Sequence, residues 1–116
     1  RKSVFDKLGG FDENIFMYTE DMELCYRVKK AGYAVAFFPH IRVIHDEHGS
    51  ADRTFAIVNI YKNLLYFYKK HRSSVEYRIL KTLMQAKAMI LIGLGKILGK
   101  PELVTTYQSA LAAIIS

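Results

Sequence analysis

The chain has 116 residues, of which 51% are hydrophobic and 24% charged, and its formal net charge is +6. This composition excludes a disordered chain and indicates a globular protein with a modest core. A single cysteine, Cys25, excludes an internal disulfide and a cysteine-based zinc site, which favours a reducing, cytoplasmic setting. The chain shows no signal-peptide pattern. Because it begins at Arg1, we expect a piece excised from a longer protein, with trimming or processing of the chain as the alternative.

The first third of the chain predicts two helices. A short helix over residues 3–8 is followed by a glycine pair, which would end it. A second helix over residues 20–31 would begin after Thr19, a plausible N-cap, and would end at Gly32.

Two short strands are predicted next, over residues 33–38 and 41–45, because both runs are rich in aromatic and β-branched side chains. Pro39 separates them and should mark a bend or an edge, since proline cannot donate to a ladder. A polar loop over residues 46–52 follows.

The remainder of the chain is predicted to be helical. A helix over residues 54–71 precedes Ser73 and Glu76, whose spacing is a capping-box pattern for a helix that runs to about Leu98. Pro101 suits the first turn of a last helix. The strongly apolar run 88–98 is too short to cross a bilayer, which needs roughly 20 residues.

Most of the excess positive charge lies after Arg53, interleaved with aromatic and aliphatic residues. A basic, apolar helical segment is typical of proteins that bind anionic lipid or a polyanion, and composition alone does not choose between them. Nucleic acid is disfavoured because no helix-turn-helix or sheet-aromatic signature accompanies the charge. Helices that simply pack together, with a solvated basic face, are an equal alternative.

Within the helix over residues 20–31, the helical period places Glu23 and Arg27 together as a favourable i,i+4 pair on a polar face. Asp21 falls on the apolar, inward face with Leu24. A carboxylate in the first turn is kept ionised by the helix dipole and could act as a general base. The alternative is that Asp21 merely completes the helix N-terminus.

His45 ends the second predicted strand and is the second candidate site residue. A single histidine is more often a hydrogen-bonded core residue than a ligand, although neutral imidazole does bind manganese or magnesium beside carboxylates. An independent zinc site at residues 45–48 is disfavoured because the H-x-x-H spacing is not that of helical zinc motifs.

Several motifs recur here in an order that resembles the second half of the catalytic domain of inverting, nucleotide-sugar-dependent glycosyltransferases. This GT-A-fold family includes rhamnosyl- and galactofuranosyltransferases. The resemblance covers about residues 1–52 and rests on the segments 9–13 (GGFDE), 19–27 (TEDMELCYR), 31–33 (AGY) and 42–45 (RVIH).

The resemblance implies a role for three residues. Asp21 would be the base that deprotonates the acceptor hydroxyl, and Glu20 would contact the acceptor or orient Asp21. His45 would complete the site of a divalent cation, Mg or Mn, that is begun by a D-x-D motif absent from this chain. The complete enzyme would use a nucleotide-sugar donor and a glycan or lipid-linked acceptor.

The fold expected from all of this is α+β and mostly helical. Residues 1–52 would be the acceptor-side, C-terminal part of a GT-A-type α/β domain with a short β-hairpin or edge-strand pair. Residues 53–116 would be a basic amphipathic helical tail. Alone, the chain should be inactive and should self-associate through unpaired strand edges. The complete enzyme would be cytoplasmic, with possible peripheral contact at the inner membrane face. The alternative is a non-enzymatic helical module that binds anionic membrane or another polyanion.

Overall fold

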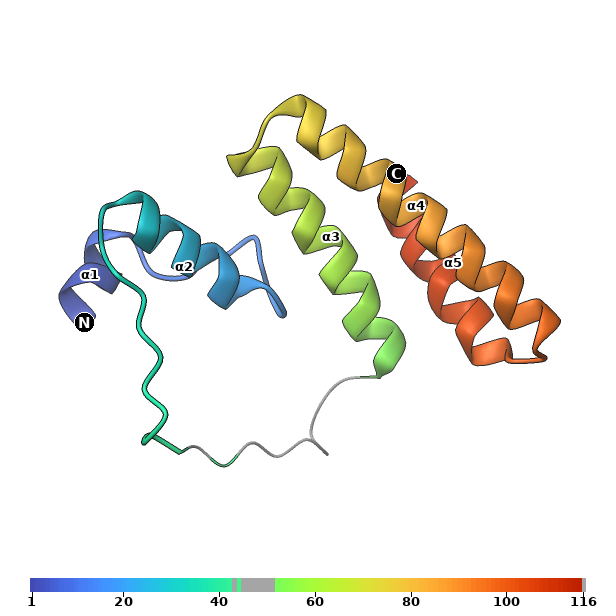
Figure 1. Ribbon diagram of the computed structural model, residues 1–116, viewed down its shortest axis with the longest axis horizontal. Helices are drawn as coiled ribbons and strands as arrows, with labels where there is room; N and C mark the ends of the chain where they lie inside the picture. Colours follow the sequence, from blue (N-terminus) through green and yellow to red (C-terminus); the bar gives the residue numbers. More distant parts are fainter. Residues whose placement is uncertain (43, 45–51, 116) are drawn as a thin grey trace. The chain divides into compact units, whose positions relative to one another are not determined.

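The computed structural model describes residues 1–42, 44 and 52–115, and the chain divides into two compact units, Arg1–Ser50 and Ala51–Ser116 (Figure 1). The first unit contains the helices α1 (Lys2–Lys7) and α2 (Glu20–Lys30). The second contains the remaining three helices, which are α3 (Arg53–His71), α4 (Ser74–Ile97) and α5 (Pro101–Ile115). Every helix predicted from the sequence is present, with bounds that differ by no more than one residue.

The predicted α+β class with a β-hairpin or edge-strand pair is wrong, because the described residues form helices and irregular segments and no strand. Residues 33–38 are irregular, and a turn follows in which the Ile41 N–H donates to the Phe38 carbonyl at 3.2 Å. Phe37 is 89% exposed. A strand needs a neighbouring chain for its ladder bonds and a surface for its side chains, and β propensity supplies neither. The all-helical class replaces the prediction; part of the run 41–45 lies outside the described residues.

The start of α4 shows the predicted capping box. The Ser73 hydroxyl accepts a hydrogen bond from the Glu76 N–H at 3.2 Å, and the Glu76 carboxylate accepts one from the Ser73 N–H at 3.0 Å. The bond from the Ser73 N–H to the carboxylate, and then a second one from the Ser73 hydroxyl at 2.8 Å, lower the pKa of Glu76. The stabilisation is therefore present above the ordinary pKa of glutamate and is lost as pH falls through the lowered folded-state value.

The end of α2 shows why the helix stops at Lys30. Gly32 has a φ of +83°, a left-handed conformation that favours glycine. Its N–H donates to the Lys29 carbonyl at 3.0 Å, and the Tyr33 N–H donates to the Val28 carbonyl at 3.1 Å. This is the Schellman pattern, which satisfies the last carbonyls of the helix and confirms the predicted role of Gly32.

The core of the second unit is built by all three of its helices, which lie side by side (Figure 1). The Tyr61 and Tyr107 rings meet edge-to-face with their centroids 6.3 Å apart. Burial, and then the neighbouring Tyr107, raise the pKa of Tyr61. The Thr54 and Thr106 hydroxyls bond at 2.8 Å and join the start of α3 to α5. The buried core residues are Tyr61, Leu65, Met84, Ala88, Tyr107, Ala110 and Ile114. No helix in the described part of the chain is long and apolar enough to cross a membrane.

A small residue permits the close approach of α4 and α5. A Cβ added at the buried Gly95 would lie 2.8 Å from the Val104 Cγ2 atom and 3.3 Å from the Lys100 carbonyl oxygen. It would also lie 3.3 Å from the Val104 backbone nitrogen. Two of these three contacts are with backbone atoms and the third is with a short branched side chain, so the helices would have to separate to admit the Cβ.

Gly95→Ala should therefore destabilise the protein by about 1–3 kcal/mol, because overpacking outweighs the gain in helix propensity. The matched control is Gly93→Ala in the same helix, where an added Cβ would have no neighbour within 4 Å. That variant should be neutral or up to about 1 kcal/mol more stable. Urea unfolding followed by circular dichroism measures both changes, and equal effects would contradict the close approach.

Candidate active site

The turn that leads into α2 has an unusual backbone. Tyr18 and Thr19 both have positive φ, 66° and 68°, which costs an L-residue roughly 1–2 kcal/mol each. Such strain persists only where the surrounding structure enforces it, and it is common at functional sites. The two residues directly precede Glu20 and Asp21, the predicted site residues.

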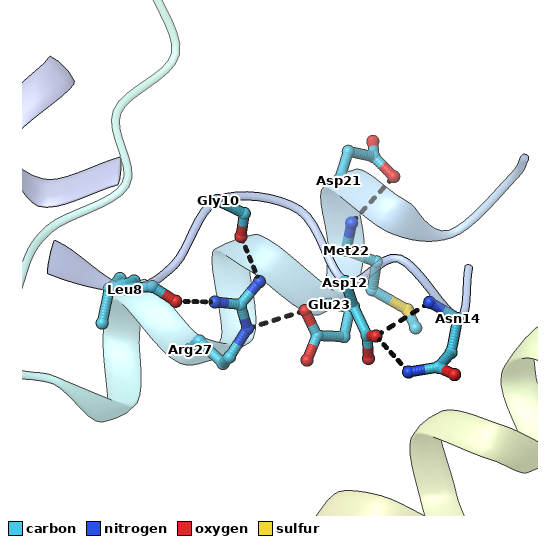
Figure 2. Close-up of polar contacts among 8 residues, drawn as sticks. All are labelled: Leu8, Gly10, Asp12, Asn14, Asp21, Met22, Glu23 and Arg27. Atoms are coloured by element: carbon cyan, nitrogen blue, oxygen red, sulfur yellow. Dashed lines mark hydrogen bonds and ion pairs between the residues drawn. The ribbon is translucent and has the colours of Figure 1, made fainter. Parts of the chain in front are cut away.

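Thr19 occupies the predicted N-cap position but does not cap the helix with its side chain. A capping hydroxyl needs an extended backbone to reach the N–H groups of the first turn, and the left-handed Thr19 does not provide it. The Thr19 carbonyl still accepts from the Glu23 N–H at 3.0 Å. The Asp21 carboxylate instead bonds the Met22 N–H at 2.7 Å (Figure 2).

The buried carboxylate of α2 is Glu23 and not Asp21. Glu23 is 0% exposed, whereas Asp21 is exposed and points away from Glu23 (Figure 2). The predicted inward placement of Asp21 is therefore wrong. The helical period sorts residues into faces but does not say which face the rest of the unit covers, and a charged pair can occupy the covered one.

Arg27 is the centre of a hydrogen-bond network that joins α2 to the end of α1 (Figure 2). Its Nε donates to the Glu23 Oε2 at 2.7 Å, which confirms the predicted pair. Its two terminal nitrogens donate to the carbonyls of Leu8 and Gly10, each at 2.6 Å. The planar guanidinium thus ties the turn after α1 to the first half of α2. The i,i+4 spacing predicts the Glu23–Arg27 ion pair from the sequence. The glycine pair predicts only the end of α1, and not the bonds from Arg27 to the carbonyls there.

The loop between the two helices is ordered by Asp12. Its Oδ1 accepts from the Asn14 N–H at 3.0 Å and from the Asn14 side-chain amide at 2.9 Å. Its carbonyl accepts from the Ile15 N–H at 2.9 Å, and Ile15 is buried. The GGFDE segment therefore has a structural role: it forms the turn against which α2 is held.

Glu20 lies at the strained turn and has a carboxylate oxygen without a hydrogen bond in the described part of the chain. Its side chain is half-buried, and its Oε2 atom is shielded from solvent without a hydrogen-bond partner among the described residues. The Thr19 hydroxyl is also shielded from solvent and has no hydrogen-bond partner among those residues. A buried polar atom without a hydrogen bond destabilises a protein by about 1–3 kcal/mol. A ligand that donates a hydrogen bond to either of these two oxygens would therefore bind favourably.

His45, the predicted metal ligand, lies outside the described residues. Within the described part of the chain, no group of three or more His, Cys, Asp or Glu side chains gathers to hold a metal ion. A groove in the first unit is lined by α1 together with Leu24, Val28 and Tyr33, and Asp21 does not line it.

Curated proteins with related sequences include two rhamnosyltransferases. The chain is 43% identical over 53 residues to N-acetylglucosaminyl-diphospho-decaprenol L-rhamnosyltransferase of Mycobacterium tuberculosis. This matched segment covers 46% of this chain and 17% of that protein. The chain is also 42% identical over 48 residues to rhamnosyltransferase WbbL of Escherichia coli, and this segment covers 41% of this chain and 18% of that protein. Each matched segment is less than a fifth of the relative's length. No family model matches the chain, and no solved structure matches it significantly.

Over part of its length, then, the chain is similar to glycosyltransferases. The names of both relatives describe rhamnosyl transfer. This supports the glycosyltransferase class that the motifs suggested, at the level of a partial region.

Proposed function

We propose that this chain is the acceptor-side part of an inverting glycosyltransferase. The enzyme transfers a sugar from a nucleotide-diphosphate donor to a hydroxyl of a glycan or lipid-linked acceptor. The observation that carries the proposal is the 42–43% identity to two rhamnosyltransferases. The Thr19-Glu20-Asp21 sequence at the start of α2 supports it, because a carboxylate in the first turn of a helix suits a general base.

Asp21 is the proposed base. Its side chain is exposed, so an acceptor hydroxyl can reach it, and the Met22 N–H bonds only one of its oxygens. The carboxylate takes the hydroxyl proton while the hydroxyl oxygen bonds the anomeric carbon of the donor. The bond from that carbon to the diphosphate breaks on the opposite side, its electron pair leaves with the nucleoside diphosphate, and the anomeric configuration inverts.

Glu20 is proposed to bind the acceptor. The Glu20 Oε2 atom and the Thr19 hydroxyl have no partner within the described residues, and a sugar hydroxyl supplies the donor that both acceptors lack. Both acceptors lie at the strained turn before α2, where Thr19 has a positive φ. Glu20 would thus hold one hydroxyl while the neighbouring Asp21 deprotonates another.

A divalent cation, Mg or Mn, is part of the proposal through the family resemblance, with His45 as a ligand. In the complete enzyme, His45→Ala should raise the manganese concentration for half-maximal activity by at least about tenfold. His40→Ala, an exposed neighbour, is the control and should leave it unchanged. Unaltered manganese activation in the first variant would remove His45 from the site.

The proposal is tested by a transfer assay on a protein of the relatives' length that contains this chain. A nucleotide-diphosphate rhamnose is the donor, and diphospholipid-linked and free glycans are tried as acceptors. NMR of the product should show a glycosidic bond of inverted configuration, and residues 1–116 alone should give no product. Retention of configuration, or no transfer from any nucleotide sugar, would contradict the proposal.

A further inference from the structure

Helix α4 is apolar on two opposite faces, and only one of them is used by the core. Met84 and Ala88 are buried against α3 and α5. The other face, called here the outer stripe, carries six exposed aliphatic side chains spaced by three, four or seven residues, which places them along one side of the helix. They are Val75 (55% exposed), Ile79 (55%), Leu83 (61%), Ile90 (62%), Leu94 (42%) and Ile97 (81%).

The outer stripe is long and continuous for the surface of so small a unit. At a rise of about 1.5 Å per residue, the distance along the helix from Val75 to Ile97 is about 33 Å. Scattered exposed aliphatic side chains are ordinary, but an aligned row of this kind marks a surface that contacts another apolar phase. None of the six residues belongs to the buried core of the unit.

Basic side chains flank the outer stripe. The helical period places the exposed Arg78 and Lys96 along one edge and the exposed Lys87 along the other. Lys81, the remaining base of α4, is half-buried on the opposite side. The helix has one acid, Glu76, and its carboxylate is engaged by Ser73 in the capping box and by Arg72 at 3.7 Å.

The charge of the whole second unit has the same sign. Residues 51–116 contain ten Lys and Arg against three Asp and Glu. An aliphatic stripe with basic edges is complementary to a bilayer that contains anionic lipid, because acyl chains accept the stripe and headgroups neutralise the edges. A second copy of the chain fits less well, since two outer stripes placed together would bring basic edges against each other in either orientation.

We propose that the outer stripe of α4 docks the protein on membranes containing anionic lipid, with α4 lying in the plane of the surface. The helix would lie on the membrane and not cross it, since no helix in the described part of the chain is long and apolar enough to cross a bilayer. The inference does not depend on the proposed transfer reaction, because it rests on the exposure and the charges of α4 alone.

The test is cosedimentation of residues 1–116 with vesicles of phosphatidylcholine, with and without phosphatidylglycerol. The protein should bind the anionic vesicles, and binding should weaken as salt is raised. The double variant Ile79→Gln/Ile90→Gln should lower the partition coefficient at least about tenfold, because it removes apolar contact with the acyl region. Both residues are more than half exposed, so circular dichroism should show an unchanged helical fold.

A second set of variants separates local from general charge. Arg78→Gln/Lys87→Gln/Lys96→Gln removes the edges of the stripe and should lower binding by roughly tenfold or more at low salt. Lys62→Gln/Lys69→Gln/Lys100→Gln removes the same charge from exposed positions outside α4 and should lower it less.

Three results would overturn the proposal. The first is recovery of the wild-type chain free of anionic vesicles. The second is binding of the apolar double variant equal to that of the wild type. The third is sedimentation equilibrium that shows a dimer abolished by Ile79→Gln/Ile90→Gln, which would mean that a second copy covers the stripe.

Discussion

Asp21→Asn should lower the turnover of the complete transferase by roughly 10²–10⁴, the usual contribution of a general base. Asparagine keeps an oxygen that can accept from the Met22 N–H, so the start of α2 should not change. It has no basic carboxylate, however, and cannot take the proton of the acceptor hydroxyl. Initial rates at saturating donor and acceptor measure the effect, and isothermal titration should show unchanged binding of the donor nucleotide.

The matched control is Asp6→Asn in the same unit. Asp6 is also an exposed carboxylate, and its ion pair with Lys2 at 2.7 Å is of the solvent-exposed kind that contributes little to stability. This control should keep its activity within about twofold. An Asp21→Asn enzyme that stayed within a few-fold of wild type would remove Asp21 from the mechanism, whatever the class of the enzyme.

Arg27→Ala should destabilise α2 by about 3–5 kcal/mol, because it breaks the ion pair of the fully buried Glu23 carboxylate. The carbonyls of Leu8 and Gly10 also lose their donor, so the turn after α1 is no longer held to the helix. Hydrogen exchange of the α2 amides reports the local free energy of opening, and it should show protection lost across the helix.

Two further variants test the cause of this loss. Lys30→Ala removes an exposed base from the same helix and should change protection little. Glu23→Gln added to Arg27→Ala should recover part of the loss, because a neutral amide costs less to bury than a carboxylate. Full protection in Arg27→Ala would show that the network contributes nothing, and no recovery in the double variant would assign the loss to the carbonyls.

The helices can be predicted from the sequence alone. Their bounds follow from local chemistry: the Ser73 and Glu76 capping box, Gly32 in a left-handed conformation, and Pro101 in a first turn. These signals depend on residues within a few positions of each other, so they are the same whatever the chain packs against. The Glu23–Arg27 pair was predictable for the same reason, since four residues along a helix bring two side chains together.

Other features depend on contacts between segments that are distant in the sequence, and no local pattern predicts them. Residues 33–38 have the composition of a strand, but a strand exists only with a partner, and the described residues provide none. Both faces of α2 carry charge, and the contacts of Arg27 with the turn after α1 decide that Glu23 is buried and Asp21 exposed. Both faces of α4 are aliphatic, and the positions of α3 and α5 decide which of them is left open. Periodicity identifies a face, but burial depends on which other segments reach it.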